Sequence, residues 1–272
     1  MHYRGRVFID ELREKRKRRK RKIAFLIVSS LIVSAVFITY ALFFSGWFSI
    51  KQTHISGNKE ISEEAVRNSV DEYIQGYYLL NTVRPFSNIL FASSEKIEHS
   101  LREKFPAIEK INVKKNLFSK NLTIEINERE PAGIWCKDSD DKCFYFDNSG
   151  VMFKAASKFS GEVILIIEDA RIRDFSLSDE FDDKELLEKI DLTKSVLDEL
   201  KFIGYSNFFL PQNSFEFWIK TKEGWYVYLD KETDISTQLV ALKKFLEEKI
   251  SANRRQALQY IDLRVNNRIY YK

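Results

Sequence analysis

Residues able to do catalytic chemistry are few and far apart in this chain of 272 residues. The three histidines are His2, His54 and His99, and their spacing assembles neither a clustered metal site nor a histidine-based triad. There is no glycine-rich phosphate loop, no H-E-x-x-H and no G-x-S-x-G motif. Asp and Glu are abundant, but nothing in the sequence separates a catalytic pair from a solvated surface. We therefore expect no catalytic residues, metal, cofactor or small-molecule substrate.

Cys136 and Cys143 are the only cysteines, and they flank six polar residues between two strand-like runs. In an oxidising compartment, a disulfide that closes this hairpin is the favoured interpretation, and two unpaired thiols are the main alternative. A zinc site would need two further soft ligands nearby, and a catalytic thiol would need a histidine partner.

The N-terminus joins a strongly basic segment to an apolar one. Residues 1–22 hold eleven Lys and Arg against three acidic residues, which leaves 33 basic and 37 acidic residues in the rest of the chain. Residues 23–44 carry no charge and would span roughly 33 Å as a helix, which matches a hydrocarbon core of about 30 Å. The sequence therefore predicts a basic tail at 1–22 and a transmembrane helix at 23–44.

The residues on either side of this apolar run predict its orientation in the membrane and whether it is cleaved. Nine of the ten residues 13–22 are basic, so the positive-inside rule places the N-terminus in the cytoplasm and the remainder outside. Residues 41–47 lack the small-residue exit of a cleaved signal peptide, so we expect a retained single-pass anchor. Because the basic run abuts the lipid bilayer, attraction to anionic lipid accounts for its charge, and we expect no nucleic-acid partner.

Apolar periodicity predicts a β-α-α-β-β domain at residues 47–130. The elements are a strand at 48–56 before a Gly57-Asn58 turn, a helix from Ser62 to Gly76, a helix capped by Ser93 or Ser94 and ended by Pro106, and strands at 108–113 and 122–126. Two amphipathic helices and three strands can bury one apolar sheet face, so this segment reads as a small α+β domain.

Residues 131–272 read as a β-domain with two helices. Strand-like runs occur at 133–137, 143–147, 151–154, 163–168, 214–221, 225–229, 259–265 and 268–271, and helical stripes occur at 186–200 and 235–246. We expect a mostly antiparallel sheet flanked by these helices, with Trp135, Trp218 and Trp225 in its core. The fold class of the whole chain is therefore expected to be α+β.

Several short motifs in this order resemble the FtsQ/DivIB family of bacterial cell-division proteins, which have one span, a POTRA domain and a β-domain. The motifs are Phe48–Asn58 followed by Ile61–Glu64, Phe105-Pro106 followed by Ile108, Ile111 and Val113, the passage Glu128–Ala132 followed by Ile134-Trp135, the hairpin Phe146–Phe153, and the closing pair Tyr260–Arg264 and Asn267–Tyr271. The Glu128–Ala132 passage is the most specific of them. The hairpin carrying Cys136 and Cys143 departs from the common pattern.

The resemblance implies a non-catalytic scaffold of the division complex at the septum, which recruits and regulates septal peptidoglycan synthesis. Its implied partners are the bitopic proteins FtsB/DivIC and FtsL. If the last strand lies at a sheet edge, its backbone can accept a partner strand, and its side chains can anchor that partner. The expected partner-binding residues are Arg264, Arg268, Ile269, Tyr270 and Tyr271.

Two other functions remain open. An exported, membrane-anchored enzyme acting on envelope substrates would need a clustered nucleophile or metal set. A POTRA module of a transport or assembly system should come with tandem POTRA repeats or a β-barrel, and neither is visible in the sequence.

Overall fold

The computed structural model describes residues 3–43, 46–76, 87–137, 142–157, 164–171, 174–181, 183–200, 203–212 and 215–272. The chain divides into two compact units. One comprises Met1–Leu101 with Ile111–Ile126, and the other comprises Arg102–Lys110 with Asn127–Lys272. The second unit therefore also includes residues 102–110 and 127–130 of the segment predicted as the β-α-α-β-β domain.

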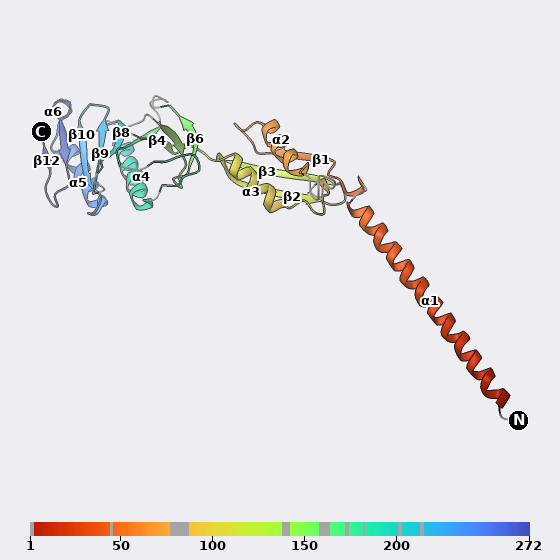
Figure 1. The fold of residues 1–272 in the computed structure, drawn as a ribbon. Helices are drawn as coiled ribbons and strands as arrows, with labels where there is room; N and C mark the ends of the chain where they lie inside the picture. Colours follow the sequence, from red (N-terminus) through yellow and green to blue (C-terminus); the bar gives the residue numbers. More distant parts are fainter. Residues whose placement is uncertain are drawn as a thin grey trace. The chain divides into compact units, whose positions relative to one another are not determined.

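The N-terminal helix α1 runs without interruption over Tyr3–Phe43 (Figure 1). Its segment Arg16–Ala41 is long and apolar enough to cross a membrane, a property that signal sequences share. The basic and apolar segments, expected as separate elements, thus belong to one helix. Arg, Lys and Glu are good helix formers, so the charged run continues the helix of the apolar run.

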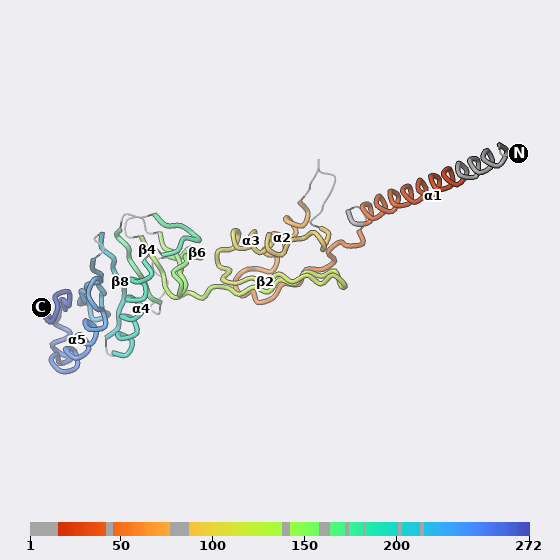
Figure 2. The backbone as a smooth tube through the Cα atoms, turned by 90° about the horizontal axis from the view of Figure 1, so that it is seen from below, coloured from red at the N-terminus to blue at the C-terminus, as the bar shows by residue number. Residues whose placement is uncertain are grey.

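The β-α-α-β-β segment, most of which lies in the first unit, has the expected order. Its elements are β1 (Gln52–Ser56), α2 (Glu63–Ile74), α3 (Ser94–Lys104), β2 (Ile108–Asn116) and β3 (Asn121–Glu128), and the sheet order is β1-β3-β2 with β1 parallel to β3. Both helices lie on one face of this sheet (Figure 2). Val66 and Leu101 on the helices and Leu122 and Ile124 on β3 are buried.

Local signals place the helix starts in this unit. The Ser62 hydroxyl accepts a hydrogen bond from the Ala65 N–H, and Glu63 and Glu64 follow in the first turn, where acidic side chains suit the helix dipole. At α3 the Ser93 hydroxyl accepts from the Lys96 N–H, so Ser93, and not Ser94, is the cap.

The first strand starts later than expected. Residues 46–48 form a short 3-10 helix, η1 (Gly46–Phe48), and β1 begins at Gln52 instead of Phe48. Ile50 N–H donates to the Ser87 carbonyl, and Ile89 N–H donates to the Phe48 carbonyl. The backbone of Phe48 and Ile50 is therefore paired with residues 87–89, which take the place of a sheet neighbour.

The second unit is built on a nine-stranded sheet. Its elements are β4 (Gly133–Lys137), β5 (Cys143–Phe146), β6 (Met152–Ala156), β7 (Leu165–Asp169), α4 (Lys184–Glu199), β8 (Tyr205–Leu210), β9 (Glu216–Thr221), β10 (Tyr226–Asp230), α5 (Ile235–Glu248), α6 (Ala252–Arg255), β11 (Tyr260–Asp262) and β12 (Tyr270–Tyr271). The strand order is β12-β11-β10-β9-β8-β7-β4-β5-β6.

The sheet is mixed: most neighbouring pairs are antiparallel, as expected, but it also contains parallel pairs that the sequence pattern did not indicate. Among the described strands, five neighbouring pairs are antiparallel and three are parallel: β4 with β7, β7 with β8, and β10 with β11. The two helices explain two of the parallel pairs. Strands β7 and β8 are joined through α4, and β10 and β11 through α5, as crossover connections between parallel strands require.

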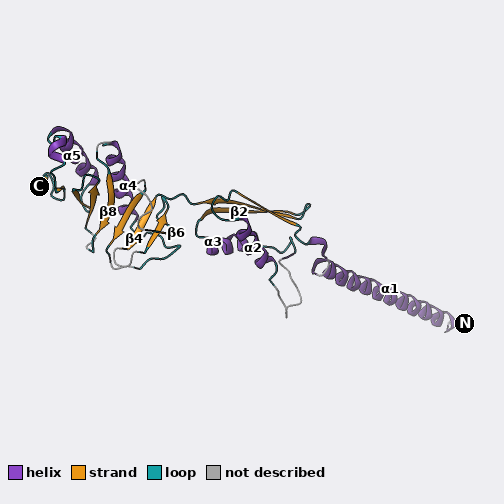
Figure 3. Ribbon diagram, turned by 90° about the horizontal axis from the view of Figure 1, so that it is seen from above, coloured by secondary structure: helices purple, strands orange, loops and turns teal. Residues whose placement is uncertain are grey.

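Helices α4 and α5 lie on the same side of this sheet (Figure 3). The core between helices and sheet includes the buried Trp135, Trp225 and Phe217, together with Ile190 of α4 and Leu242 of α5. Trp135 and Trp225 are core residues as expected. Trp218 is not, because it is only half-buried and adjacent residues of a strand point to opposite faces.

Candidate functional site

The last strand, β12, forms one end of the nine-stranded sheet. It pairs with β11 in antiparallel register, with Tyr271 opposite Ile261 and Tyr270 opposite Asp262. The sheet order gives β12 one strand neighbour, so its other edge has no strand beside it among the described residues. An edge strand of this kind presents backbone donors and acceptors that a further strand can use.

The hydrogen bonds of Lys272 define which backbone groups face that edge. Lys272 N–H donates to the Tyr260 carbonyl, and Gln259 N–H donates to the Lys272 carbonyl, so Lys272 faces β11. Backbone groups alternate in direction along an extended chain. The N–H and C=O of Tyr271, and by the same alternation those of Ile269, therefore point away from β11 and toward the edge.

The side chains of this segment divide between the two faces of the sheet. On the helix side, Ile269 packs against the core, and the Tyr271 ring lies 5.0 Å from the Phe245 ring of α5, centroid to centroid. On the opposite face, Arg268 Nη1 donates to the Tyr270 hydroxyl at 3.3 Å. Tyr270 is 45% exposed and Tyr271 55% exposed, so both rings can still contact a partner.

Arg264 is half-buried, and two carboxylates hold its side chain in place. Its backbone N–H and Nε both donate to Asp262 Oδ1, and Nη2 donates to Asp262 Oδ2 at 2.6 Å. Nη1 bonds Glu216 on β9, and the guanidinium lies 5.0 Å from the centre of the Tyr228 ring on β10. Arg264 therefore braces β9, β10 and β11, and it positions the neighbouring edge strand.

The charges around Arg264 stabilise one another. Burial raises the pKa of Asp262, but the side-chain and backbone hydrogen bonds from Arg264 outweigh it and leave that pKa below its ordinary value. The hydrogen bonds that Arg264 donates to Asp262 and Glu216 raise the pKa of Arg264 against the effect of burial. Asp262 and Arg264 therefore keep their opposite charges at neutral pH, as a structural ion pair requires.

The same Asp-x-Arg arrangement occurs at the end of β7. Arg171 donates through its backbone N–H and Nε to Asp169 Oδ1 and through Nη2 to Asp169 Oδ2, and its guanidinium lies 5.1 Å from the Phe181 ring centre. Sequence reasoning did not single out Asp169 and Arg171. The spacing shared with Asp262 and Arg264 is the signal that could have identified them.

Two of the motifs behind the family resemblance meet in the second unit. Arg129, from the Glu128–Ala132 passage, forms an ion pair with Asp147, which opens the Asp147–Gly150 turn. Asp147 Oδ1 also accepts from the N–H groups of Ser149 and Val151. Burial raises the pKa of Asp147, but these bonds and Arg129 together leave it below its ordinary value.

Cys136 and Cys143 are joined by a disulfide between β4 and β5. The two residues are directly opposite in the antiparallel register, and both are buried. The bond therefore closes the hairpin whose tip, residues 138–141, lies outside the described residues.

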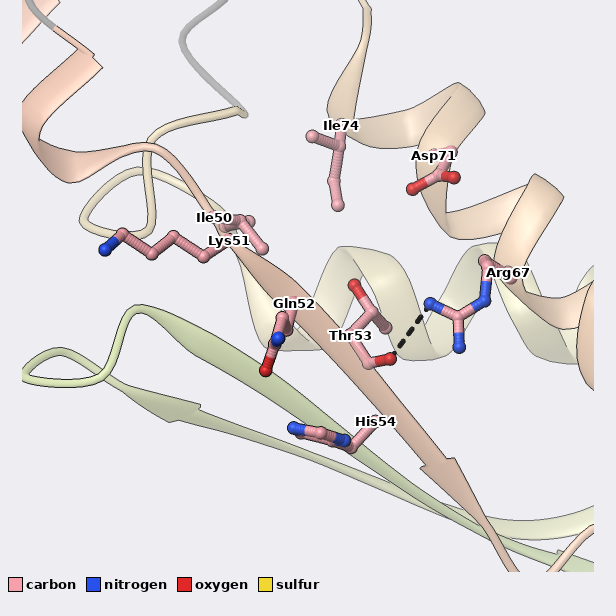
Figure 4. Close-up of a pocket in the computed structure, with 8 residues that line it drawn as sticks. All are labelled: Ile50, Lys51, Gln52, Thr53, His54, Arg67, Asp71 and Ile74. Atoms are coloured by element: carbon pink, nitrogen blue, oxygen red, sulfur yellow. Dashed lines mark hydrogen bonds between the residues drawn. The ribbon is translucent and has the colours of Figure 1, made fainter.

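A shallow depression of about 440 Å³ lies beside β1 and α2 in the first unit (Figure 4). Among the eight residues that line it, one hydrogen bond is drawn, from Arg67 Nη1 to the Thr53 carbonyl at 3.0 Å. Arg67 Nη2 is paired with Glu63. His54 is the sole histidine in the lining and contacts no activating carboxylate there, so the depression assembles no nucleophile and base.

Within the described parts of the chain, no group of three or more His, Cys, Asp or Glu side chains is arranged to hold a metal ion. Comparison with known proteins assigns no function either, because no protein-family model and no curated protein matches the chain.

Proposed function

We propose that this protein is a non-catalytic, membrane-anchored scaffold of the bacterial division complex, of the FtsQ/DivIB kind. The apolar part of α1 spans the cell membrane with the basic tail in the cytoplasm, and both compact units lie outside. The order of one apolar helix, a β-α-α-β-β unit and a larger sheet unit supports the proposal. The pairing of Arg129 with Asp147 supports it too, because it joins two of the resembling motifs in space.

The open edge of β12 is the observation that carries the function. Ile269 and Tyr271 direct backbone donors and acceptors outward, and Tyr270 and Tyr271 offer one aromatic ring on each face. A partner segment that adds as a strand gains main-chain hydrogen bonds from this edge and specificity from the alternating side chains. The partners are FtsB/DivIC-like and FtsL-like bitopic proteins, and through them the scaffold recruits and regulates septal peptidoglycan synthesis.

Replacement of Ile269 tests this proposal. Ile269→Pro removes an outward N–H and leaves the bonds of Lys272 to β11 in place, so we expect it to abolish co-purification of the partner with the full-length protein. Ile269→Ala keeps the N–H and serves as the matched control, which should still co-purify the partner.

A fluorescent fusion of the full-length chain gives the cellular readout. We expect mid-cell recruitment for the wild type and for Ile269→Ala. Retained partner binding by Ile269→Pro would refute the edge-strand model, and uniform membrane distribution of the wild type would favour an exported envelope enzyme instead.

A further inference from the structure

A row of aromatic rings crosses the sheet of the second unit on the face opposite α4 and α5. Phe209 of β8, Trp218 of β9, Tyr228 of β10 and Tyr260 of β11 contribute one ring each. Successive centroids lie 6.2, 5.8 and 6.0 Å apart. We call these four residues the aromatic row.

The register places the aromatic row on a single face. Phe209 is opposite Trp218, and Trp218 is opposite Tyr228, so the three rings share one side of the sheet. Their strand neighbours Phe208, Phe217 and Val227 are fully buried in the core beneath the helices. Each ring of the row is half-buried, and the Arg264 guanidinium also lies over the Tyr228 ring.

A partly exposed row of Trp, Tyr and Phe has the composition that protein interfaces concentrate at their energetic centres. The row is continuous with the β12 edge, because Tyr270 lies opposite Asp262, the second residue after Tyr260, and so shares this face. A strand added beside β12 would therefore direct every second side chain toward the same face as the row.

Charged side chains of both signs surround the row. Lys220 lies 6.0 Å from the centre of the Tyr226 ring, and Arg268 bonds the Tyr270 hydroxyl. The register also places Glu168 opposite Phe209 and Asp230 opposite Glu216, so carboxylates share this face with the two cations. The aromatic rings, and not the charges, are therefore what this face offers to a partner.

We infer that the polypeptide which adds a strand to β12 also lays an apolar-rich segment across the aromatic row. This inference rests on the proposed function, because it gives the β12 partner a second contact on the outer face. Strand pairing at the β12 edge fixes the register of the partner, and contact with the aromatic row buries apolar area of both proteins.

Site-specific photo-crosslinking of the full-length protein in living cells tests the inference. A photoreactive phenylalanine analogue replaces Trp218 on the row, Tyr271 on the edge, or Leu192 on the opposite face, where Leu192 is 39% exposed on α4. We expect an adduct with the same protein from positions 218 and 271, and no such adduct from position 192.

The other outcomes separate the two proposals. An adduct from position 271 without one from position 218, or with a different protein at 218, overturns the second contact and leaves the edge strand standing. Absence of an adduct at position 271 overturns the edge strand and this inference together.

Discussion

The ring of Tyr271, in the last strand, lies 5.0 Å from the ring of Phe245 on α5, centroid to centroid. Two elements that are 26 positions apart in the sequence therefore meet at the edge of the sheet. Tyr271 is positioned from one side by this ring and from the other by its pairing with Ile261. The edge strand is short, but the helix beneath it limits the positions that it can adopt.

Truncation of Phe245 should weaken the edge. Phe245→Ala removes the ring that supports Tyr271, so we expect about tenfold weaker partner binding. We also expect the free energy of unfolding to fall by about 2 kcal/mol, a moderate loss because Phe245 is only half-buried. Val240→Ala on the exposed side of α5 is the control. Partner titration and chemical denaturation of the full-length protein in detergent measure both quantities, and unchanged binding by Phe245→Ala would show that the helix does not support the edge.

Arg264 should contribute through geometry as well as charge. Arg264→Ala leaves Asp262 and Glu216 without their shared cation, and we expect a loss of about 2 kcal/mol in stability. Arg264→Lys keeps the charge but not the planar fork, so it should recover only part of that loss. Equal denaturation midpoints for the lysine variant and the wild type would contradict the bracing role.

The disulfide should stabilise the hairpin between β4 and β5. Closing a loop with a sequence separation of 7 removes conformations of the unfolded chain, which the loop-entropy relation puts at about 2 kcal/mol. We expect Cys136→Ser with Cys143→Ser to lower the melting temperature, and a reducing agent to have the same effect on the wild type but none on the double variant. A wild type insensitive to reductant while its thiols become titratable would contradict this.

Stability should fall in acid because of Asp147. Its pKa in the folded state lies below its ordinary value of 3.8, so its carboxylate stabilises the fold above that pH. The contribution is lost as the pH falls below 3.8 and through the folded-state pKa. Asp183 and Asp262 act in the same direction, so Asp147→Asn should flatten the acid limb of the stability curve only in part. An unaltered acid limb would exclude Asp147 from the effect.

Strong periodicity made most elements predictable, and the exceptions have physical reasons. Helices α4 and α5 carry clear apolar stripes, and the hairpin of β9 and β10 has an alternating pattern around the Gly224 turn, where φ is +96°. Strand β8 was missed because Phe208, Phe209 and Leu210 are consecutive apolar residues. They obscure the alternation, since Phe209 belongs to the aromatic row on the outer face.

Contacts between residues far apart in the chain could not be predicted from the sequence. The role of Arg264 as a partner anchor stays a prediction. Its bond to Glu216 spans 48 positions, and no local pattern indicates such a pair. The parallel pairs of the sheet were missed for a similar reason, because strand direction follows from how α4 and α5 cross over the sheet. Ile269, Tyr270 and Tyr271 do belong to the edge, because their place at the end of the sheet depends on chain order and a local turn.

Amide hydrogen exchange at the edge tests the central claim most directly. In the full-length protein with its co-purified partner, we predict slowed exchange at the Ile269 and Tyr271 amides, which point outward, and little change at the Lys272 amide, which already bonds Tyr260. The Ile269→Ala variant should show the same protection at Tyr271. Partner binding with unchanged exchange at both Ile269 and Tyr271 would contradict strand addition at β12.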